Sequence, residues 1–204
     1  MKTFIKPTLI SSLTVLAVGL SACSQASSAD EAPSVSAEMP AGNWDIQPES
    51  SHIQFSAEQE GETFTGEFGE FSGIIDFDPT APEAGSVRIT VPLKSVDAGS
   101  NDRNSTLPEK VWFSIKSHPM AVYSSSDISA QGDGFIAKGE LTLKGVTVPL
   151  DLPFNLAVDG ETAIMTSNVE MDRTKWNVGA APWNTDEWVS KAVKLELKVT
   201  ANKN

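Results

Sequence analysis

Apolar and polar positions alternate with a period of two along much of this chain. In the longest run every second residue from Val146 to Val158 is apolar, with Thr, Pro, Asp, Asn and Ala between. Similar runs cover 87–93 and 193–199. A period of two puts successive side chains on opposite faces of a strand. We therefore predict three strands here, each with one apolar face.

Weaker alternation, interrupted by turn signals such as Gly132-Asp133-Gly134 and Asp159-Gly160, predicts further strands. They cover Ile53–Gln59, Thr63–Phe68, Phe71–Phe77, Val122–Ile128, Gly134–Leu143 and Ala163–Met171. Pro149 and Pro153 cannot donate ladder hydrogen bonds. The segment that contains them is therefore expected at a sheet edge or in an irregular strand.

The segment 102–116 breaks the pattern. It contains Pro108-Glu109-Lys110, and proline suits the first position of a helix. We predict one or two short helical turns there. Eight or nine antiparallel strands with one short helical excursion favour an all-β fold, a closed antiparallel β-barrel of about eight strands, because closure removes exposed edges. Such a barrel is either filled by its own side chains or hollow enough for one small ligand.

The first residues have the layout of a secretory signal peptide. Lys2 and Lys6 precede an apolar run from Leu9 to Leu20 that is too short to span a bilayer of ~30 Å. Leu20-Ser21-Ala22-Cys23 resembles the bacterial lipobox, in which the cysteine receives a diacylglycerol and its freed amine is acylated. We expect a signal peptide over 1–22, lipidation of Cys23 and a disordered tether to residue 43. The alternative is a secreted protein with a stray cysteine near its cleavage site.

The net charge of the chain limits the kinds of partner it can bind. The chain has 15 basic and 27 acidic residues, a net charge of −12, and removal of residues 1–22 takes away two lysines and no acids. The acidic balance argues against nucleic acid and against docking on anionic lipid. Attachment to the membrane would then come from acyl chains on Cys23. We expect a periplasmic, lipid-anchored protein, and Ser24 in place of Asp favours the outer membrane.

Several blocks carry a family resemblance. They are Ser51-His52-Ile53-Gln54-Phe55, the segment 71–77, the segment 139–147 (GELTLKGVT) and Arg173-Thr174-Lys175-Trp176. In order and spacing they resemble the YceI family of periplasmic lipid-binding proteins, over 44–204. The resemblance implies a lipocalin-like barrel around a polyisoprenoid, an isoprenoid quinone or a fatty-acid derivative. The sequence departs from the family pattern at Asn104, Ser114, His118 and Asn177, which leaves the identity of the lipid undecided.

Large apolar side chains on these strands are the candidate lining of a lipid cavity, although the same residues could fill a solid core. They are Phe55, Phe68, Phe71, Ile75, Phe77, Ile89, Val91, Trp112, Phe113, Phe135, Leu141, Leu143, Leu150, Leu152, Phe154 and Trp176. Arg103 is a candidate contact for a lipid head group, or it anchors the helical segment by ion pairing.

Three functions remain. The first is non-enzymatic transport or sequestration of an apolar lipid in the cell envelope, without any other cofactor. The second is an enzyme acting on such a lipid, which would need paired polar groups at inward positions that are almost all apolar. The third is a structural or stress-related lipoprotein with a filled barrel. No catalytic motif or metal site is predicted, because His52 and His118 lack identifiable acidic partners. Whether the protein forms a homodimer is left undecided by the sequence.

Overall fold

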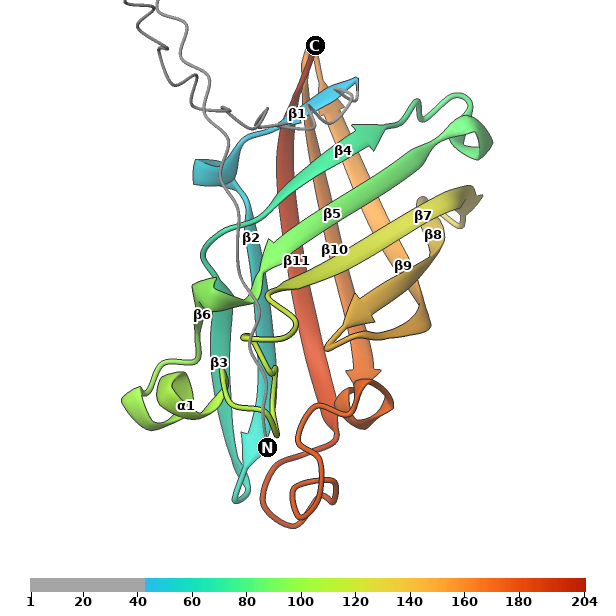
Figure 1. Ribbon diagram of the computed structural model, residues 1–204. Helices are drawn as coiled ribbons and strands as arrows, with labels where there is room; N and C mark the ends of the chain where they lie inside the picture. The colour runs from blue at the N-terminus through green and yellow to red at the C-terminus, as the bar shows by residue number, and fades with distance from the viewer. Residues whose placement is uncertain (1–42) are drawn as a thin grey trace, which may run out of the picture. The chain divides into compact units, whose positions relative to one another are not determined.

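Eleven strands form one antiparallel sheet in the computed structural model, which describes residues 43–204 (Figure 1). The strands are β1 (Trp44–Ile46), β2 (His52–Gln59), β3 (Glu62–Phe68), β4 (Ser72–Asp76), β5 (Ser86–Pro92), β6 (Val96–Asp97), β7 (Met120–Gln131), β8 (Gly134–Leu143), β9 (Val146–Asp159), β10 (Thr162–Asp172) and β11 (Ala192–Lys203). The predicted signal peptide, Cys23 and nearly all of the predicted tether lie outside the described residues.

The short strand β1 closes the barrel. Trp44 pairs with Ile75 of β4 on one side and with Lys203 of β11 on the other. The ring therefore contains eight strands: β1, β4, β5, β7, β8, β9, β10 and β11. Strands β2, β3 and β6 continue the wall from the far half of β11. The predicted closed barrel of about eight strands is confirmed.

Strand β9 changes partners along its length. From Val146 to Phe154 it pairs only with β8, and its ladder with β10 runs from Asp159↔Thr162 to Asn155↔Thr166. Pro149 and Pro153 lie in the part without β10. The prediction that these prolines mark an edge or irregular strand is therefore confirmed, although β9 lies within the barrel wall.

The helical excursion is α1 (Asn101–Thr106), and four short 3₁₀ turns accompany the strands: η1 (Pro48–Ser50), η2 (Pro82–Ala84), η3 (Leu93–Ser95) and η4 (Arg173–Trp176). The Ser100 hydroxyl caps α1 by accepting from the Arg103 backbone N–H at 3.4 Å. The helical turns were predicted, but Pro108 does not begin the helix. It follows α1 by two residues, where a proline also suits the chain because it cannot continue a helix.

Two apolar clusters fill most of the interior. One lies toward β1 and contains Trp44, Phe77, Ile128, Ala137, Leu152, Ala163 and Ala201; we call it the β1-end cluster. The other lies toward α1 and contains Leu93, Phe113, Ala121, Leu143, Met171, Trp176 and Val178; we call it the α1-end cluster. No helix within 43–204 is both long and apolar enough to cross a bilayer.

Two cationic side chains hold the loops at the α1 end. Arg173 is 4% exposed and uses its five N–H donors on the carbonyls of Val178, Gly179, Trp183, Val189 and Ser190, at 2.6 to 3.3 Å. Lys144 Nζ donates to the carbonyls of Val111 and Asn177. These contacts tie the loop 177–191 and the segment after α1 to the barrel, which closes this end.

Candidate functional site

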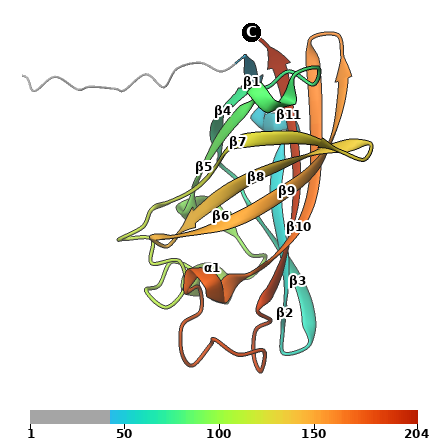
Figure 2. The same ribbon diagram turned by 90° about the vertical axis from the view of Figure 1, so that its right-hand side faces the viewer.

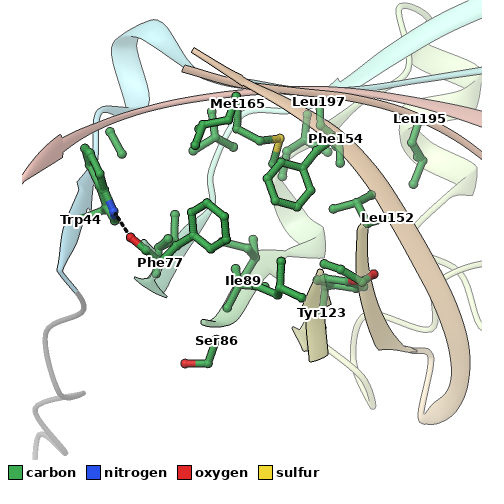
Figure 3. A pocket seen from close by; sticks show the side chains of 18 of the residues that line it. Trp44, Phe77, Ser86, Ile89, Tyr123, Leu152, Phe154, Met165, Leu195 and Leu197 are labelled. Carbon is green, nitrogen blue, oxygen red and sulfur yellow. Dashed lines mark hydrogen bonds between the residues drawn. The ribbon is translucent and has the colours of Figure 1, made fainter. Parts of the chain in front are cut away.

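A cavity of about 180 Å³ lies inside the barrel (Figure 3). Its wall comes from every strand of the ring and from Ile53 of β2, and it is almost wholly apolar. Figure 3 shows Ile89 of β5, Leu152 and Phe154 of β9, Met165 of β10 and Leu197 of β11 pointing toward a common space. An apolar space of this size is comparable to the engineered cavity of about 150 Å³ that stays dry and binds benzene.

Small residues leave this space unfilled. Ala121, Ala137, Ala163 and Ala201 all line the cavity and are all at most 7% exposed. They lie on two pairs of neighbouring strands, β7 with β8 and β10 with β11, and Ala163 is the direct cross-strand neighbour of Ala201. Protein interiors are otherwise close-packed. Alanine at these four inward positions therefore contributes less side-chain volume to the interior than a larger aliphatic residue would.

Aromatic side chains close the cavity toward β1. Phe77 packs edge-on against Phe135 and Phe154, with ring centroids 5.2 and 5.8 Å apart. The Trp44 indole Nε1–H donates to the Phe77 carbonyl at 2.9 Å, so β1 fixes the chain after β4 at the rim. Ser86, at the start of β5, is the single exposed side chain among the described lining residues. Ser86 pairs with Asp76, next to Phe77, so it marks the edge of the lining at this end.

Half of the predicted lining residues face the cavity. These eight are Ile75, Phe77, Ile89, Val91, Leu141, Leu150, Leu152 and Phe154. They come from the strands with the cleanest alternation and their neighbours β4 and β8. Whether they contact a lipid stays a prediction.

Five other predicted residues lie in or against the α1-end cluster and do not line the cavity: Phe68, Trp112, Phe113, Leu143 and Trp176. Trp176 is 1% exposed, and its Nε1–H donates to the Leu141 carbonyl at 2.8 Å. This indole and its neighbours form a solid floor below the cavity. In this structure these positions pack in the filled end of the barrel, and whether they contact a lipid stays a prediction.

The remaining three predicted positions also lie outside the lining. Phe55 is buried against Phe64 and Phe68, where a side chain on Gly66 would meet its ring. Phe135 stacks on Phe154 and packs edge-on against Phe77 within the β1-end cluster. Phe71 precedes β4 and is half-buried. Large aromatic residues are thus a poor guide to the cavity, since they supply packing as readily as lining.

Arg103 does not reach the cavity either. Its Nε–H donates to the Ala98 carbonyl at 2.8 Å, one terminal nitrogen donates to Gln59 Oε1 at 3.2 Å, and the guanidinium lies 4.5 Å from the centre of the Phe64 ring. Arg103 therefore anchors α1 to β2 and β3. It does so through hydrogen bonds and a cation–π contact, where the sequence suggested an ion pair or a head-group contact.

The most informative lining residue that the sequence did not indicate is Tyr123. Its hydroxyl donates to the Ala137 carbonyl at 2.9 Å, and its ring lies over Gly139, where a Cβ would come within 2.6 Å of it. Burial raises the pKa of the phenol well above its ordinary value, with the Asp151 carboxylate adding to the shift. Tyr123 is therefore a neutral wall residue whose proton is committed to the backbone.

A β-bulge explains why alternation misplaces Tyr123. The register between β7 and β8 shifts between Ser125 and Asp127, so Tyr123 and Ile128 both face inward although one number is odd and the other even. The Ser125 hydroxyl donates to the Lys138 carbonyl at 2.9 Å and accepts from the Asp127 N–H. A bulge shifts the side-chain phase by one residue. If side chains alternated strictly along β7, an inward Ile128 would put Tyr123 on the outer face of the barrel.

Across 43–204 no group of three His, Cys, Asp or Glu side chains is arranged to hold a metal ion. His52 Nε2 lies 4.0 Å from a Glu196 carboxylate oxygen, and the His118 ring lies against Gly145 in the turn between β8 and β9. Both histidines sit apart from the cavity lining.

A closed eight-stranded antiparallel barrel around an apolar cavity defines a lipocalin-like barrel. Within that class the chain belongs to the YceI family: residues 44–201 match the YceI-like domain. The family resemblance carried by the sequence blocks is confirmed.

Curated relatives and solved structures agree with this assignment. UPF0312 proteins of Pectobacterium atrosepticum and Yersinia pestis are 30% and 32% identical over 119 and 123 residues, which is 58% and 59% of this chain. The chain spans 62% and 64% of their own length. Burkholderia cenocepacia BcnA superposes with a TM-score of 0.74 at 28% identity, covering 78% of this chain and 100% of BcnA.

A second solved structure is a polyisoprenoid-binding domain from Saccharophagus degradans, implicated in plant cell wall breakdown. It has a TM-score of 0.63 and 16% identity, covering 79% of this chain and 99% of that domain. At this identity the likeness shows the fold alone.

Proposed function

We propose that this protein binds one long apolar lipid without chemically changing it, and carries or sequesters that lipid in the bacterial cell envelope. The ligand class is a polyisoprenoid, an isoprenoid quinone or a fatty-acid derivative. The observation that carries the proposal is the apolar cavity inside the barrel, walled by Leu152, Leu195 and their neighbours. Family membership and the polyisoprenoid binding of the S. degradans domain support it.

The size of the cavity limits how much of the ligand it holds. About 180 Å³ is comparable to a cavity that accepts a six-carbon ring, and it is below the ~300–1,000 Å³ of typical ligand pockets. The resting cavity therefore takes the end of an apolar chain, and the rest of the molecule extends outward or displaces wall side chains. Burial contributes ~0.8 kcal/mol per CH₂, but a bilayer offers nearly the same transfer free energy. Exchange with a membrane is then readily reversible.

The polar groups around the cavity favour binding over catalysis. Tyr123 is neutral and hydrogen-bonded to the backbone, and Ser86 lies at the exposed rim. Acid–base catalysis needs a titratable group within hydrogen-bond reach of the substrate, and no carboxylate, amine or imidazole is among the described lining residues. The acidic chain also favours a ligand with a neutral head group over a pyrophosphate.

The cellular setting is part of the same proposal. Cleavage before Cys23 and acylation of that cysteine would tether the barrel to the envelope by acyl chains, with two or more chains giving stable attachment. About twenty residues separate Cys23 from Trp44, enough to reach up to roughly 70 Å when extended. A barrel on such a tether could collect and release lipid near the membrane surface while remaining attached.

Mass spectrometry of solvent extracts from the purified full chain tests the proposal. We expect an unmodified lipid of one of the three classes, in roughly equimolar amount. Leu141→Trp, which narrows the cavity, should abolish recovery of that lipid. Glu140→Trp is the matched control, since the adjacent residue lies on the outer face of β8. Recovery of a chemically altered lipid would indicate catalysis, and equal recovery from both variants would place the lipid elsewhere.

A further inference from the structure

The barrel wall has a seam between β9 and β10. The two strands leave their shared hairpin as a ladder, and the last backbone pair is Asn155↔Thr166. Beyond it, the rest of β9 pairs only with β8, and β10 from Ser167 to Asp172 pairs only with β11. Figure 2 shows β9 and β10 diverging from the hairpin toward the α1 end. Backbone hydrogen bonds therefore do not close the wall along this line.

The sequence of β9 keeps the seam unpaired. The Pro153 carbonyl accepts a hydrogen bond from Ser167 of β10, so the backbone groups of Pro153 point toward β10. Pro149, four residues earlier, has the same phase in the strand and points its backbone to the same side. Neither proline has an N–H. Two donors that a continuous β9–β10 ladder would need are thus absent from the facing edge.

One buried side chain holds the vertex of the seam. Ser167 is 3% exposed, and its hydroxyl donates to the Pro153 carbonyl at 2.6 Å. It is the first residue of β10 beyond the ladder, and its side chain makes the cross-strand bond that the backbone does not. A single hydroxyl therefore closes the ladder at the point where the strands separate.

The cavity lies directly behind this seam. Leu150 and Leu152 line it from the unpaired part of β9, and Met165 lines it from β10 just before the ladder ends. Beyond that pair no backbone ladder joins β9 to β10, and the turn η4, which follows β10, contacts β9. The β9–β10 ladder has five residue pairs, with the Ser167 hydrogen bond beyond its end, whereas the β10–β11 ladder has eleven consecutive residue pairs.

We propose that the apolar chain of the lipid enters and leaves the cavity sideways through the seam between β9 and β10. The Ser167–Pro153 hydrogen bond holds this seam closed and breaks when the lipid passes. This inference rests on the proposed lipid binding and adds the route. A lateral route lets an apolar chain slide in along its length while its head group stays outside. The rival route is the β1 end of the barrel near Ser86, the exposed residue among the described lining residues.

Disulfide staples test the route in the full chain carrying Cys23→Ser, which removes the lone native cysteine. The seam staple combines Asn155→Cys with Thr166→Cys, and the control staple combines Asp159→Cys with Thr162→Cys at the hairpin end of the same ladder. Residues directly opposite in an antiparallel ladder lie about 4.5–5.5 Å apart, within disulfide range. Neither pair lines the cavity. The probe is all-trans-retinol, a fluorescent neutral isoprenoid alcohol, followed by stopped-flow fluorescence.

We expect the oxidised seam staple to slow retinol uptake and release at least tenfold with an unchanged equilibrium Kd, and a reductant to restore both rates. The control staple should change either rate less than twofold. Ser167→Ala should accelerate both uptake and release. A seam staple that loads as fast as the control overturns the seam route, as does slow uptake in Ser86→Phe with no effect of the staple. Wild type that binds no retinol at equilibrium contradicts lipid binding itself, and the route with it.

Discussion

Filling the cavity from within should stabilise the free protein and exclude its ligand at the same time. Ala163 is 6% exposed, lines the cavity from β10 and lies opposite Ala201 of β11. Ala163→Leu adds three carbon atoms to the space that the alanines leave open. In a hollow interior this change removes apolar surface from an empty cavity, whereas in a filled interior it would force neighbouring groups apart.

The two situations differ in the sign of the stability change. Three buried carbons contribute up to ~2.4 kcal/mol, and the lost rotamer freedom of leucine costs ~0.5–1 kcal/mol. The ceiling is the cost of the whole cavity, about 4 kcal/mol for 180 Å³ at ~24 cal/mol per Å³. We therefore expect a gain of about 1–2 kcal/mol. In a chain of this size that raises Tm by roughly 2–8 °C.

The assay is a thermal melt of delipidated protein beside lipid recovery from the same preparation. Ala98→Leu is the matched control, because Ala98 is fully buried but lies outside the cavity lining. Overpacking there should cost about 1–3 kcal/mol. We expect Ala163→Leu to melt higher than wild type and to carry less lipid. If it melts as low as Ala98→Leu, the space beside Ala163 is not free and the argument for a hollow barrel is refuted.

Three further predictions concern the loops, the acid limb of stability and the anchor. Arg173→Met should destabilise the domain by at least ~3 kcal/mol in denaturant titrations, because five carbonyls lose their donors, and Arg173→Lys should not restore it since lysine offers three donors in another geometry. Hydrogen bonds from Asn104 and Thr174 lower the pKa of the Asp97 and Asp172 carboxyl groups below their ordinary value of 3.8, so the stability they contribute is complete above pH 3.8 and is lost as the pH falls through the lowered values. Asp97→Asn should therefore reduce the loss of stability at acid pH, and an unchanged loss would contradict this origin. Cys23→Ala should release the protein from the membrane fraction, and sedimentation with membranes at high salt despite the substitution would disprove the acyl anchor.

The sequence alone determined the architecture because strand formation is read locally. Alternation over 146–158 and its shorter counterparts predicted the strands, and closure followed from their number and antiparallel order. The prolines at 149 and 153 also predicted a feature of strand pairing from the sequence alone, because a residue without an N–H cannot donate to a neighbouring strand. Family membership was also visible at this level, since its motifs are short blocks in fixed order.

The tertiary structure decided where the barrel is hollow. Whether an inward side chain packs in a filled core or lines a cavity depends on the total side-chain volume that the eight strands place at the same height in the barrel. Neighbouring residues in the sequence do not determine that volume. Phe113 and Trp176, two candidate lining residues, pack in the α1-end cluster, while alanines at 121, 137, 163 and 201 line the cavity. Tyr123 faces inward because a bulge shifts its strand by one residue, and Arg173 is buried because five carbonyls of a distant loop converge on it. Each outcome depends on residues far apart in the chain, and that is why it appears only when the chain is folded.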